Sequence, residues 1–423
     1  MQGHRARRRA VGHRLSHAHA PEILAPAPTL TSSPTRYPMT TPETPRANWS
    51  YPTAIRFGAG RVAEIADACA AAGMTRPLLV TDRGLAGLPI TARMQDLMET
   101  AGLGRALFAD VSPNPDSQDL EAGVAAFRAG GHDGVIAFGG GSGLDLAKMV
   151  AFMSGQTRPV WDFEDVDDWW TRADPAGIAP IVAVPTTAGT GSEVGRASVI
   201  TNPETHTKKV IFHPRVLPSV VICDPELTVG MPPAITAGTG MDAFAHCLEA
   251  YCAPSFHPMS AGIALEGMRL VKEYLPRAFA DGRDLEARAQ MMAAAAMGAV
   301  AFQKGLGAIH AISHPVGAIY GTHHGTTNAA AMAAVLRFNR PAIEDRIERA
   351  AAYLGVAGGF DGFAAFVADL NTRLGMPSGL GALGVEAARI PELATMALRD
   401  PTAGGNPIPL TQATAEALIA DAM

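Results

Sequence analysis

The chain lacks several features that would place it in a broad class at once. Its 423 residues contain only 4 cysteines, and no two of them form a CxxC pair. A disulfide framework is not expected in so long a chain, and a reducing cytoplasm is the default compartment. No apolar run reaches the ~20 residues of a membrane helix. The nearest run, residues 291–302, is short and rich in alanine, which indicates a buried helix rather than a membrane-spanning one. We expect no membrane partner.

An excess of positive charge is also missing. The formal net charge is -6, whereas nucleic-acid binding needs a basic face. We therefore expect no nucleic-acid partner. What the chain has instead is apolar residues, which make up 48% of it against 17% charged residues. That composition can fill well-buried cores, and a length of 423 residues predicts two domains rather than one.

Residues 1–48 differ from the rest of the chain. Four arginines lie between Arg5 and Arg9, no acid precedes Glu22, and a stretch rich in histidine, proline, serine and threonine follows. Such a segment does not bury enough apolar surface to fold. We predict a disordered tail, or an extension from a misplaced start with the true start at Met39. A transit-like leader is the alternative, and a secretory signal is not expected because no apolar h-region follows the arginines.

Residues 49–224 alternate between strand and helix patterns. Short apolar runs stand at residues 77–81, 134–138, 181–185 and 220–223, with helix-like stretches at 119–129 and 143–153. Continuous apolar strands separated by helices predict a parallel sheet covered on both faces. Residues 194–200 and 208–212, joined by a turn at 202–205, predict an appended hairpin. We expect a Rossmann-like α/β domain that binds a nucleotide.

From residue 225 onward, helical patterns dominate and strand signals are nearly absent. The predicted helices cover residues 234–253, 259–281, 285–302 and 342–354. We therefore expect an all-α domain over residues 225–423. The functional site should lie in the cleft between the two domains, where ligand sites are common.

A glycine-rich turn joins the second of these strands to a helix, and it consists of Gly139, Gly140, Gly141 and Ser142. Glycines let a ligand approach the backbone, and a helix N-terminus offers free N–H groups and a positive dipole end to a pyrophosphate. Three glycines alone would fit a tight turn equally well. The strand before and the helix after favour phosphate binding.

A second polar loop follows the next strand and contains Thr186, Thr187 and Thr190. One such loop alone is usually an ordinary polar loop without a ligand. Two of them at the ends of parallel strands indicate that both bind the same nucleotide. Asp82 directly follows the first strand. A carboxylate there accepts from ribose hydroxyls and repels a 2′-phosphate, which favours NAD over NADP. An exposed turn aspartate is the plainer interpretation and the more frequent one.

Histidines gather in two segments of the helical half. Asp242 and His246 are four residues apart, which puts them on one face of a helix. His310 and His314 repeat that spacing, and a histidine pair precedes Gly325. A lone helical histidine is usually a core or surface residue, but this grouping is harder to explain that way. Imidazoles with one carboxylate suit Fe(II), Zn or another borderline divalent ion rather than Ca or Mg, and no thiolate is spaced for a cysteine-based zinc site.

With these motifs, the chain resembles the iron-dependent (group III) alcohol dehydrogenases, which are related in fold to dehydroquinate synthase and glycerol dehydrogenase. The resemblance covers residues 51–423 and rests on the glycine-rich turn, the loop at 186–193 and, most specifically, the histidine signature at 307–325. It implies a Rossmann-like nucleotide-binding domain followed by an all-α metal-binding domain, as in the dehydroquinate synthase-like fold.

The resemblance implies a role for each matching residue. The implied metal ligands are Asp242, His246, His310 and His324. His314 matches a histidine near the nicotinamide and is the candidate catalytic residue of a proton path. The residues that match cofactor contacts are Asp82, Gly139, Gly140, Gly141, Ser142, Asp145, Thr186, Thr187, Thr190 and Lys208. The implied cofactors are NAD and Fe(II), with Zn or another divalent metal as the alternative.

Three positions depart from the family's pattern. His323 stands where the signature usually has proline, which leaves the register of the last ligand open, although Gly325 directly after His324 favours His324. Ser313 replaces a usual alanine, which we expect to be harmless. Arg196 brings a cation where many members are uncharged. It is either a solvated strand charge, the plainer interpretation, or a contact for the carboxylate of an acidic substrate.

The predicted function is hydride transfer between a small alcohol, or its aldehyde or ketone, and NAD. A homodimer in the cytoplasm is the expected setting. One alternative is an NAD- and metal-dependent lyase of the dehydroquinate synthase type, which should carry more basic residues for a phosphorylated substrate. The other is a non-catalytic member of the fold, against which the complete set of four ligands argues.

Overall fold

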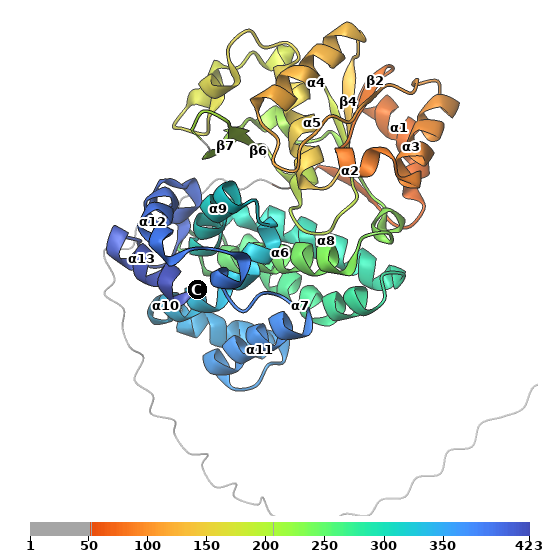
Figure 1. Cartoon of the computed structure of the whole chain (residues 1–423). Helices are drawn as coiled ribbons and strands as arrows, with labels where there is room; N and C mark the ends of the chain where they lie inside the picture. The colour runs from red at the N-terminus through yellow and green to blue at the C-terminus, as the bar shows by residue number, and fades with distance from the viewer. Residues whose placement is uncertain (1–50, 52, 206) are drawn as a thin grey trace, which may run out of the picture. The chain divides into compact units, whose positions relative to one another are not determined.

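The computed structural model describes residues 51, 53–205 and 207–423, all within one compact unit that spans residues 46–423. The predicted extension at residues 1–48 lies outside the described residues. The first half of the described chain forms a six-stranded sheet whose paired strands are all parallel, in the order β1-β8-β5-β4-β2-β3 (Figure 1). The strands are β1 Ala54–Phe57, β2 Pro77–Val80, β3 Leu107–Phe108, β4 Gly134–Gly139, β5 Ile181–Pro185 and β8 Val220–Cys223.

Helices cover both faces of this sheet. They are α1 Ile65–Ala71, α3 Pro89–Thr100, α4 Ser117–Ala129 and α5 Gly141–Met153, while the one-turn helix α2 Arg83–Ala86 follows β2 and buries none of its residues. Leu79 and Ile136 pack with residues of α1 and α3, whereas Leu78 and Val135 pack with residues of α4 and α5. Burial on both faces explains why these strands are continuous apolar runs. The four predicted strands are confirmed, while the edge strands β1 and β3 were not predicted because they are short and partly exposed.

The predicted hairpin is also confirmed. Strand β6 (Ala197–Asn202) pairs antiparallel with β7 (Thr207–Phe212). The first strand begins later than residue 194 because Ser192–Val194 form one turn of 3-10 helix. This hairpin stands apart from the six-stranded sheet, and β7 contacts helix α9 of the helical half.

The second half of the chain is helical, as predicted. All of residues 225–423 are described, and they contain no strand. The helices are α6 Pro233–Cys252, α7 Pro258–Ala280, α8 Leu285–Ala301, α9 Ala308–Tyr320, α10 His324–Leu354, α11 Gly359–Arg373, α12 Ile390–Arg399 and α13 Gln412–Asp421. Helix α10 begins well before the predicted residue 342. The first turns of α10 are rich in small residues, so they show no clear apolar periodicity. Pro341 lies inside α10, at a position where proline would usually end a helix.

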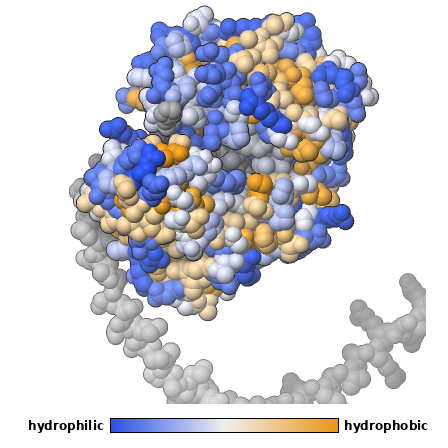
Figure 2. Space-filling model, in the orientation of Figure 1, coloured by the Kyte–Doolittle hydropathy of each residue, from blue (hydrophilic) through white to orange (hydrophobic). Residues whose placement is uncertain are grey.

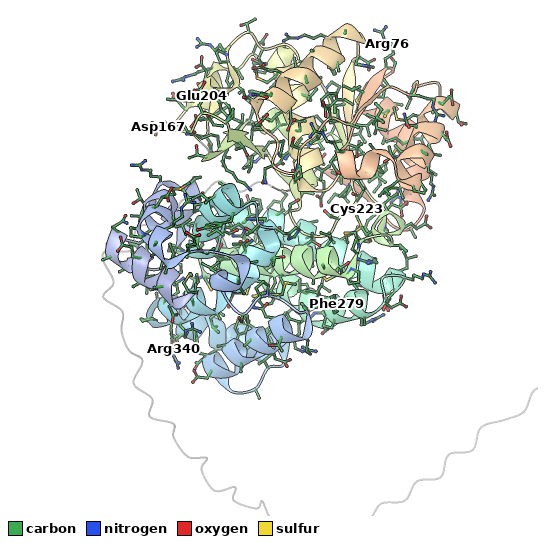
Figure 3. All side chains as sticks on the ribbon, viewed as in Figure 1. Arg76, Asp167, Glu204, Cys223, Phe279 and Arg340 are labelled. Atoms are coloured by element: carbon green, nitrogen blue, oxygen red, sulfur yellow. The ribbon has the colours of Figure 1, made fainter. Side chains whose placement is uncertain are left out.

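The chain passes from sheet to helices after Cys223, the last residue of β8, which is labelled in Figure 3. Both halves belong to one compact unit, so the boundary between residues 224 and 225 stays a prediction as a domain boundary. The loop after β5 lies against the helices: a Cβ at Gly189 would meet Thr239 of α6, and one at Gly191 would meet Ala299 of α8. The face shown in Figure 2 is indented between the sheet and the helices.

Among the described residues, no single helix is long and apolar enough to cross a membrane. Two bent pairs pass a test of length and composition together, Leu285–Lys304 with Ala308–Tyr320 and His324–Leu354 with Gly359–Arg373. Core helices of folded proteins pass the same test, and two of these helices, α9 and α10, carry site residues described next.

Candidate active site

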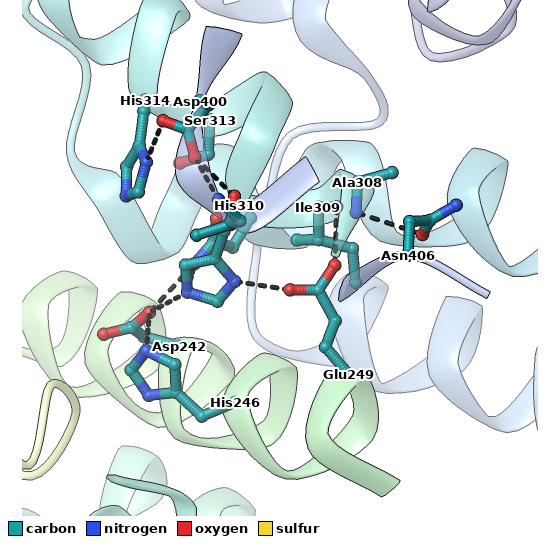
Figure 4. A network of polar contacts seen from close by, with 12 residues as sticks. Asp242, His246, Glu249, Ala308, Ile309, His310, Ser313, His314, Asp400 and Asn406 are labelled. Carbon is teal, nitrogen blue, oxygen red and sulfur yellow. Dashed lines mark hydrogen bonds and ion pairs between the residues drawn. The ribbon is translucent and has the colours of Figure 1, made fainter. Parts of the chain in front are cut away.

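Three helices bring the four predicted metal ligands together. Helix α6 carries Asp242 and His246 on one face, α9 carries His310, and α10 begins with His324. Oδ1 of Asp242 lies 3.7 Å from Nε2 of His246, 3.7 Å from Nε2 of His310 and 3.4 Å from Nε2 of His324. Figure 4 shows the first three of these side chains directed toward one another. The four side chains come from three different helices, so the packing of these helices assembles the group.

The spacing of these atoms fits a shared ion. The separations are too long for hydrogen bonds, yet three imidazole nitrogens surround one carboxylate oxygen. Bonds of ~2.1 Å to a tetrahedral metal place neighbouring ligand atoms ~3.4 Å apart. One carboxylate with three imidazoles is also a donor set that suits iron, zinc and similar divalent metals. The ligand atoms of Asp242, His246 and His310 all lie within 4.8 Å of one another, as a shared ion requires, and His324 approaches this group from the side of Asp242.

The electrostatics of the pocket require a positive charge. Burial lowers the pKa of His310, but the carboxylates of Asp242 and Glu249 outweigh burial and raise it to about 9. Burial would raise the pKa of Asp242, yet the neighbouring imidazoles hold it well below its ordinary value. Burial lowers the pKa of His246 to about 4. Two buried carboxylates thus attract a proton to His310, and a divalent cation supplies that charge in place of the proton.

Glu249 is a site residue that the sequence analysis missed. It is buried on α6, and its Oε2 lies 2.6 Å from Nδ1 of His310 (Figure 4). Its Oε1 accepts a hydrogen bond from the backbone N–H of Ile309 at 2.6 Å. A carboxylate in this position fixes the tautomer and the orientation of a metal-binding histidine. A signal was available, because Glu249 lies two helical turns after Asp242 on the ligand-bearing face of α6.

Asn328 was missed as well. Its side-chain Nδ2 donates to Oδ1 of Asp242 at 2.8 Å and lies 3.3 Å from Nε2 of both His310 and His324. The residue is fully buried and stands one helical turn after His324. The amide therefore covers one side of the ligand group and holds the Asp242 carboxylate in place.

The structure gives the two adjacent histidines different surroundings. His324 directs Nε2 toward Asp242, whereas His323 is the N-cap of α10 and accepts a hydrogen bond from the backbone N–H of Thr326. The His323 ring lies so close to Gly238 of α6 that a Cβ there would meet it at 2.7 Å. Of the pair, His324 is the one that faces the other candidate ligands.

His314 lies beside the ligand group. Its ring stacks on that of His324 with centroids 5.3 Å apart, and its Nδ1 lies 2.7 Å from Oδ2 of Asp400. Burial would raise the pKa of Asp400, yet His314 and Thr402 hold it below its ordinary value. The sequence analysis did not find Asp400, because it follows α12, far from His314 in the sequence, and only the packing of α9 against that segment brings the two together.

Lys208 reaches toward the same region from strand β7. Burial lowers the pKa of its ammonium group, and Asp145, Asp242 and Asp400 act in the opposite direction. Two of these carboxylates belong to the helical half. Lys208 is therefore a cation of the α/β half that lies within electrostatic range of two carboxylates of the helical half.

The predicted cofactor turn connects β4 to α5 as expected. Gly139 has φ 155, a conformation that favours glycine, and a Cβ there would meet Oδ2 of Asp82 at 3.4 Å. Asp82 thus lies directly beside the turn. The turn also contacts the second loop, because a Cβ at Gly140 would meet Thr187 at 3.1 Å and one at Gly141 would meet Thr190 at 2.6 Å. The two loops form one surface at the ends of β4 and β5.

Some of the predicted cofactor residues contact the protein itself. Asp145 accepts from the Ser192 hydroxyl at 2.5 Å and from the backbone N–H of Val199 at 3.0 Å. The Ser142 hydroxyl donates to the carbonyl of Pro113 at 2.6 Å. The backbone N–H of buried Thr186 donates to the Gly139 carbonyl at 2.9 Å. These contacts tie the loops to each other and to β6, and direct contact of these side chains with NAD stays a prediction.

Arg196 is placed apart from the ligand group. Its guanidinium lies over the Phe212 ring, 5.2 Å from the centroid, and it contacts none of the four candidate metal ligands. Lys208, in contrast, lies within electrostatic range of Asp242, because that carboxylate acts to raise the pKa of its ammonium group.

A parallel sheet that ends in two polar loops, beside a cluster of three histidines and an aspartate, defines a nucleotide-linked metalloenzyme. Models of two families match the chain, iron-containing alcohol dehydrogenase over residues 52–225 and the C-terminal region of iron-containing alcohol dehydrogenases over residues 236–423. The chain belongs to the iron-containing alcohol dehydrogenase family.

Named relatives and solved structures agree with this assignment. The chain is 40% identical to 4-hydroxybutyrate dehydrogenase of Cupriavidus necator, over 84% of this chain and 94% of that protein. It is 36% identical to 1,3-propanediol dehydrogenase of Klebsiella pneumoniae, over 83% and 92%. A crystal structure of 1,3-propanediol oxidoreductase matches with a TM-score of 0.85 at 34% identity, over 89% of this chain and 100% of that one. Sulfoacetaldehyde reductase of Bifidobacterium kashiwanohense, solved with NAD+, matches with a TM-score of 0.80 at 33% identity, over 88% and 97%.

These findings confirm the predicted family, fold class and enzyme class. The chain is an oxidoreductase rather than a lyase of the dehydroquinate synthase type. The family description names iron, and one relative holds NAD+, in line with the two predicted cofactors.

Proposed function

We propose that this protein transfers a hydride between a small alcohol and NAD at an iron ion held by Asp242, His246, His310 and His324. The observation that carries the proposal is the convergence of three Nε2 atoms on Oδ1 of Asp242 at 3.4–3.7 Å. When bound, iron supplies Lewis acidity that lowers the pKa of an alcohol, and NAD accepts the hydride.

The chain's own residues prepare this chemistry. Asp242 is the only anionic member of the ligand set, so a divalent ion held by these residues would keep part of its positive charge, which Lewis-acid chemistry requires. Glu249 holds His310 from behind through Nδ1, and Asn328 donates to Oδ1 of Asp242 on the side where the ligand atoms meet. His314, oriented by Asp400 through Nδ1, is placed to carry a proton between the site and solvent. The N-terminus of α5 and the backbone of the glycine-rich turn offer N–H groups to the pyrophosphate, and Asp82 accepts from the ribose.

For the substrate, we propose a short hydroxy acid or its semialdehyde. The name of the 40%-identical relative supports this class, and so does the positive charge of Lys208 beside the centre. Lys208 is half-buried, and no residue in the described part of the chain forms a hydrogen bond or ion pair with its ammonium. A substrate carboxylate would pair with it, whereas a neutral alcohol gains nothing there.

The test is NADH formation by the Fe(II)-loaded protein, prepared without oxygen, with 4-hydroxybutyrate, 1-butanol and 1,3-propanediol. We expect the highest kcat/KM with 4-hydroxybutyrate and no turnover by His310→Ala. Lys208→Met should raise KM for 4-hydroxybutyrate far more than KM for 1-butanol, with KM for NAD measured separately. Lys209→Met is the matched control, because Lys209 pairs with Glu164 at 2.8 Å. Equal losses on acidic and neutral substrates in Lys208→Met would rule out the carboxylate role.

We further propose a homodimer in a reducing, cytoplasmic setting. Two-fold dimers are the commonest soluble oligomers, and all four cysteines are free and buried, which suits a reducing compartment. Light scattering of the purified protein and fractionation of cells that express it test the two statements.

A further inference from the structure

The four candidate ligands are not held equally well. The side chains of Asp242, His246 and His310 are 2–6% exposed, whereas that of His324 is 27% exposed. His324 is also the first residue of its helix, after a connection that includes Gly321 in a left-handed conformation. Its ring therefore depends on side-chain contacts for its orientation more than the other ligands do.

One such contact comes from Ser313, the position where the family signature usually has alanine. The Ser313 hydroxyl oxygen lies 2.9 Å from Nδ1 of His324, and Ser313 is fully buried. Within the described part of the chain, no other residue forms a hydrogen bond with that nitrogen. The sequence analysis expected serine to be harmless at this position, and the structure places its hydroxyl beside a candidate ligand.

The protons of the pair have only one arrangement that leaves Nε2 free for a metal. A neutral imidazole that binds through Nε2 carries its hydrogen on Nδ1. That hydrogen is donated to the Ser313 oxygen, and the Ser313 hydroxyl hydrogen is directed toward the His324 carbonyl, 3.5 Å away. With alanine at this position, the Nδ1 hydrogen would face a methyl group, and the ring would lose the contact that selects its tautomer.

We propose that Ser313 is a positioning residue for His324, which holds Nε2 directed at Oδ1 of Asp242 and so strengthens metal binding. The inference rests on the metal centre of the proposed function. Ser313 lies on α9, one turn after His310 and next to His314, so the same helix sets the positions of both neighbouring histidines. His310 has a carboxylate partner in Glu249, while His324 has a neutral hydroxyl, which makes His324 the more easily released ligand.

The experiment measures metal affinity and not only turnover. Co(II) and Zn(II) dissociation constants are determined by chelator competition for the wild type, Ser313→Ala and Ser313→Thr, together with the visible absorption bands of the Co(II) forms. Loss of a hydrogen-bond partner behind a ligand histidine typically weakens metal binding by ~10-fold or more. We therefore expect Ser313→Ala to bind metal ~10-fold more weakly and to show shifted Co(II) bands. Ser313→Thr, which keeps the hydroxyl, should restore both.

Ser260→Ala is the matched control. Ser260 is fully buried on α7, which carries no candidate ligand, and its hydroxyl has no hydrogen-bond partner in the described structure. Wild-type affinity and an unchanged Co(II) spectrum in Ser313→Ala would overturn the inference, as would an equal loss in Ser260→Ala. A wild-type protein that binds no metal would instead overturn the proposed metal centre. Alanine favours helices, so Ser313→Ala should fold, and the thermal midpoint of the metal-free form verifies it.

Discussion

The two halves of the molecule treat their candidate functional side chains in opposite ways. In the helical half, the ligand atoms of Asp242, His246 and His310 lie close together without hydrogen bonds between them. In the α/β half, both oxygens of Asp145 accept hydrogen bonds from the protein. Polar atoms that converge without satisfying one another indicate an external partner, whereas satisfied atoms indicate a scaffold.

The largest effect is expected from replacing each of the two adjacent histidines, His323 and His324, by alanine in separate variants. His324→Ala removes a nitrogen directed at Asp242, so we expect metal content and alcohol-dependent NADH formation to be lost together. His323→Ala removes only the N-cap of α10 and should keep its metal, at a stability cost of ~1 kcal/mol. Elemental analysis after dialysis and a thermal scan measure both. Metal retained in His324→Ala but lost in His323→Ala would reverse the ligand assignment.

The next largest effect should come from Glu249→Gln. Glutamine keeps the shape but removes the charge behind His310, so we expect metal affinity to fall by ~10–100-fold. Chelator competition gives the affinity. Glu266→Gln is the control, because Glu266 pairs with Arg269 on the surface of α7 and should leave metal binding unchanged. An unaltered dissociation constant in Glu249→Gln would mean that the carboxylate does not support His310.

Glu193, a buried residue of the α/β half, allows a test based on how protein stability depends on pH. Burial raises its pKa to about 7 from an ordinary value of 4.5. The folded protein therefore keeps a proton that the unfolded chain has already lost, and this group destabilises the fold increasingly as pH rises from 4.5 to 7. Glu193→Gln should be more stable than the wild type by on the order of 2 kcal/mol at pH 8, with a smaller difference at pH 5. Denaturant unfolding at the two pH values measures this, and a difference independent of pH would contradict it.

Gly141→Ala should have the smallest effect and tests whether the two loops act as one surface. Its Cβ would meet Thr190 at 2.6 Å, so we expect a stability loss on the order of 1 kcal/mol and weaker NAD binding. Gly87→Ala is the control, because a Cβ there meets nothing within 4 Å. Calorimetric titration with NAD would show equal affinities in both variants if the loop contact did not matter.

Much of this architecture could be predicted from periodicity. The inner strands are buried on both faces, which produces the continuous apolar runs that predicted them, and the i,i+4 pair of Asp242 and His246 predicted a metal-binding helix face. Asp400 and Asn328 could not be predicted in the same way, because their approach to the site depends on how helices pack. Asp145 and Ser142 show a further limit. The residue types that bind a cofactor also form hydrogen bonds between loops, and only the structure shows which of the two roles a given side chain has.

The side chains that contact the candidate ligands, Glu249, Ser313 and Asn328, all come from the helical half. Lys208 comes from the other half and lies within electrostatic range of Asp242. Selection can therefore act on the two halves separately. If Lys208 pairs with the substrate as proposed, substitutions in the hairpin that carries it would change substrate preference without altering the residues that hold the metal.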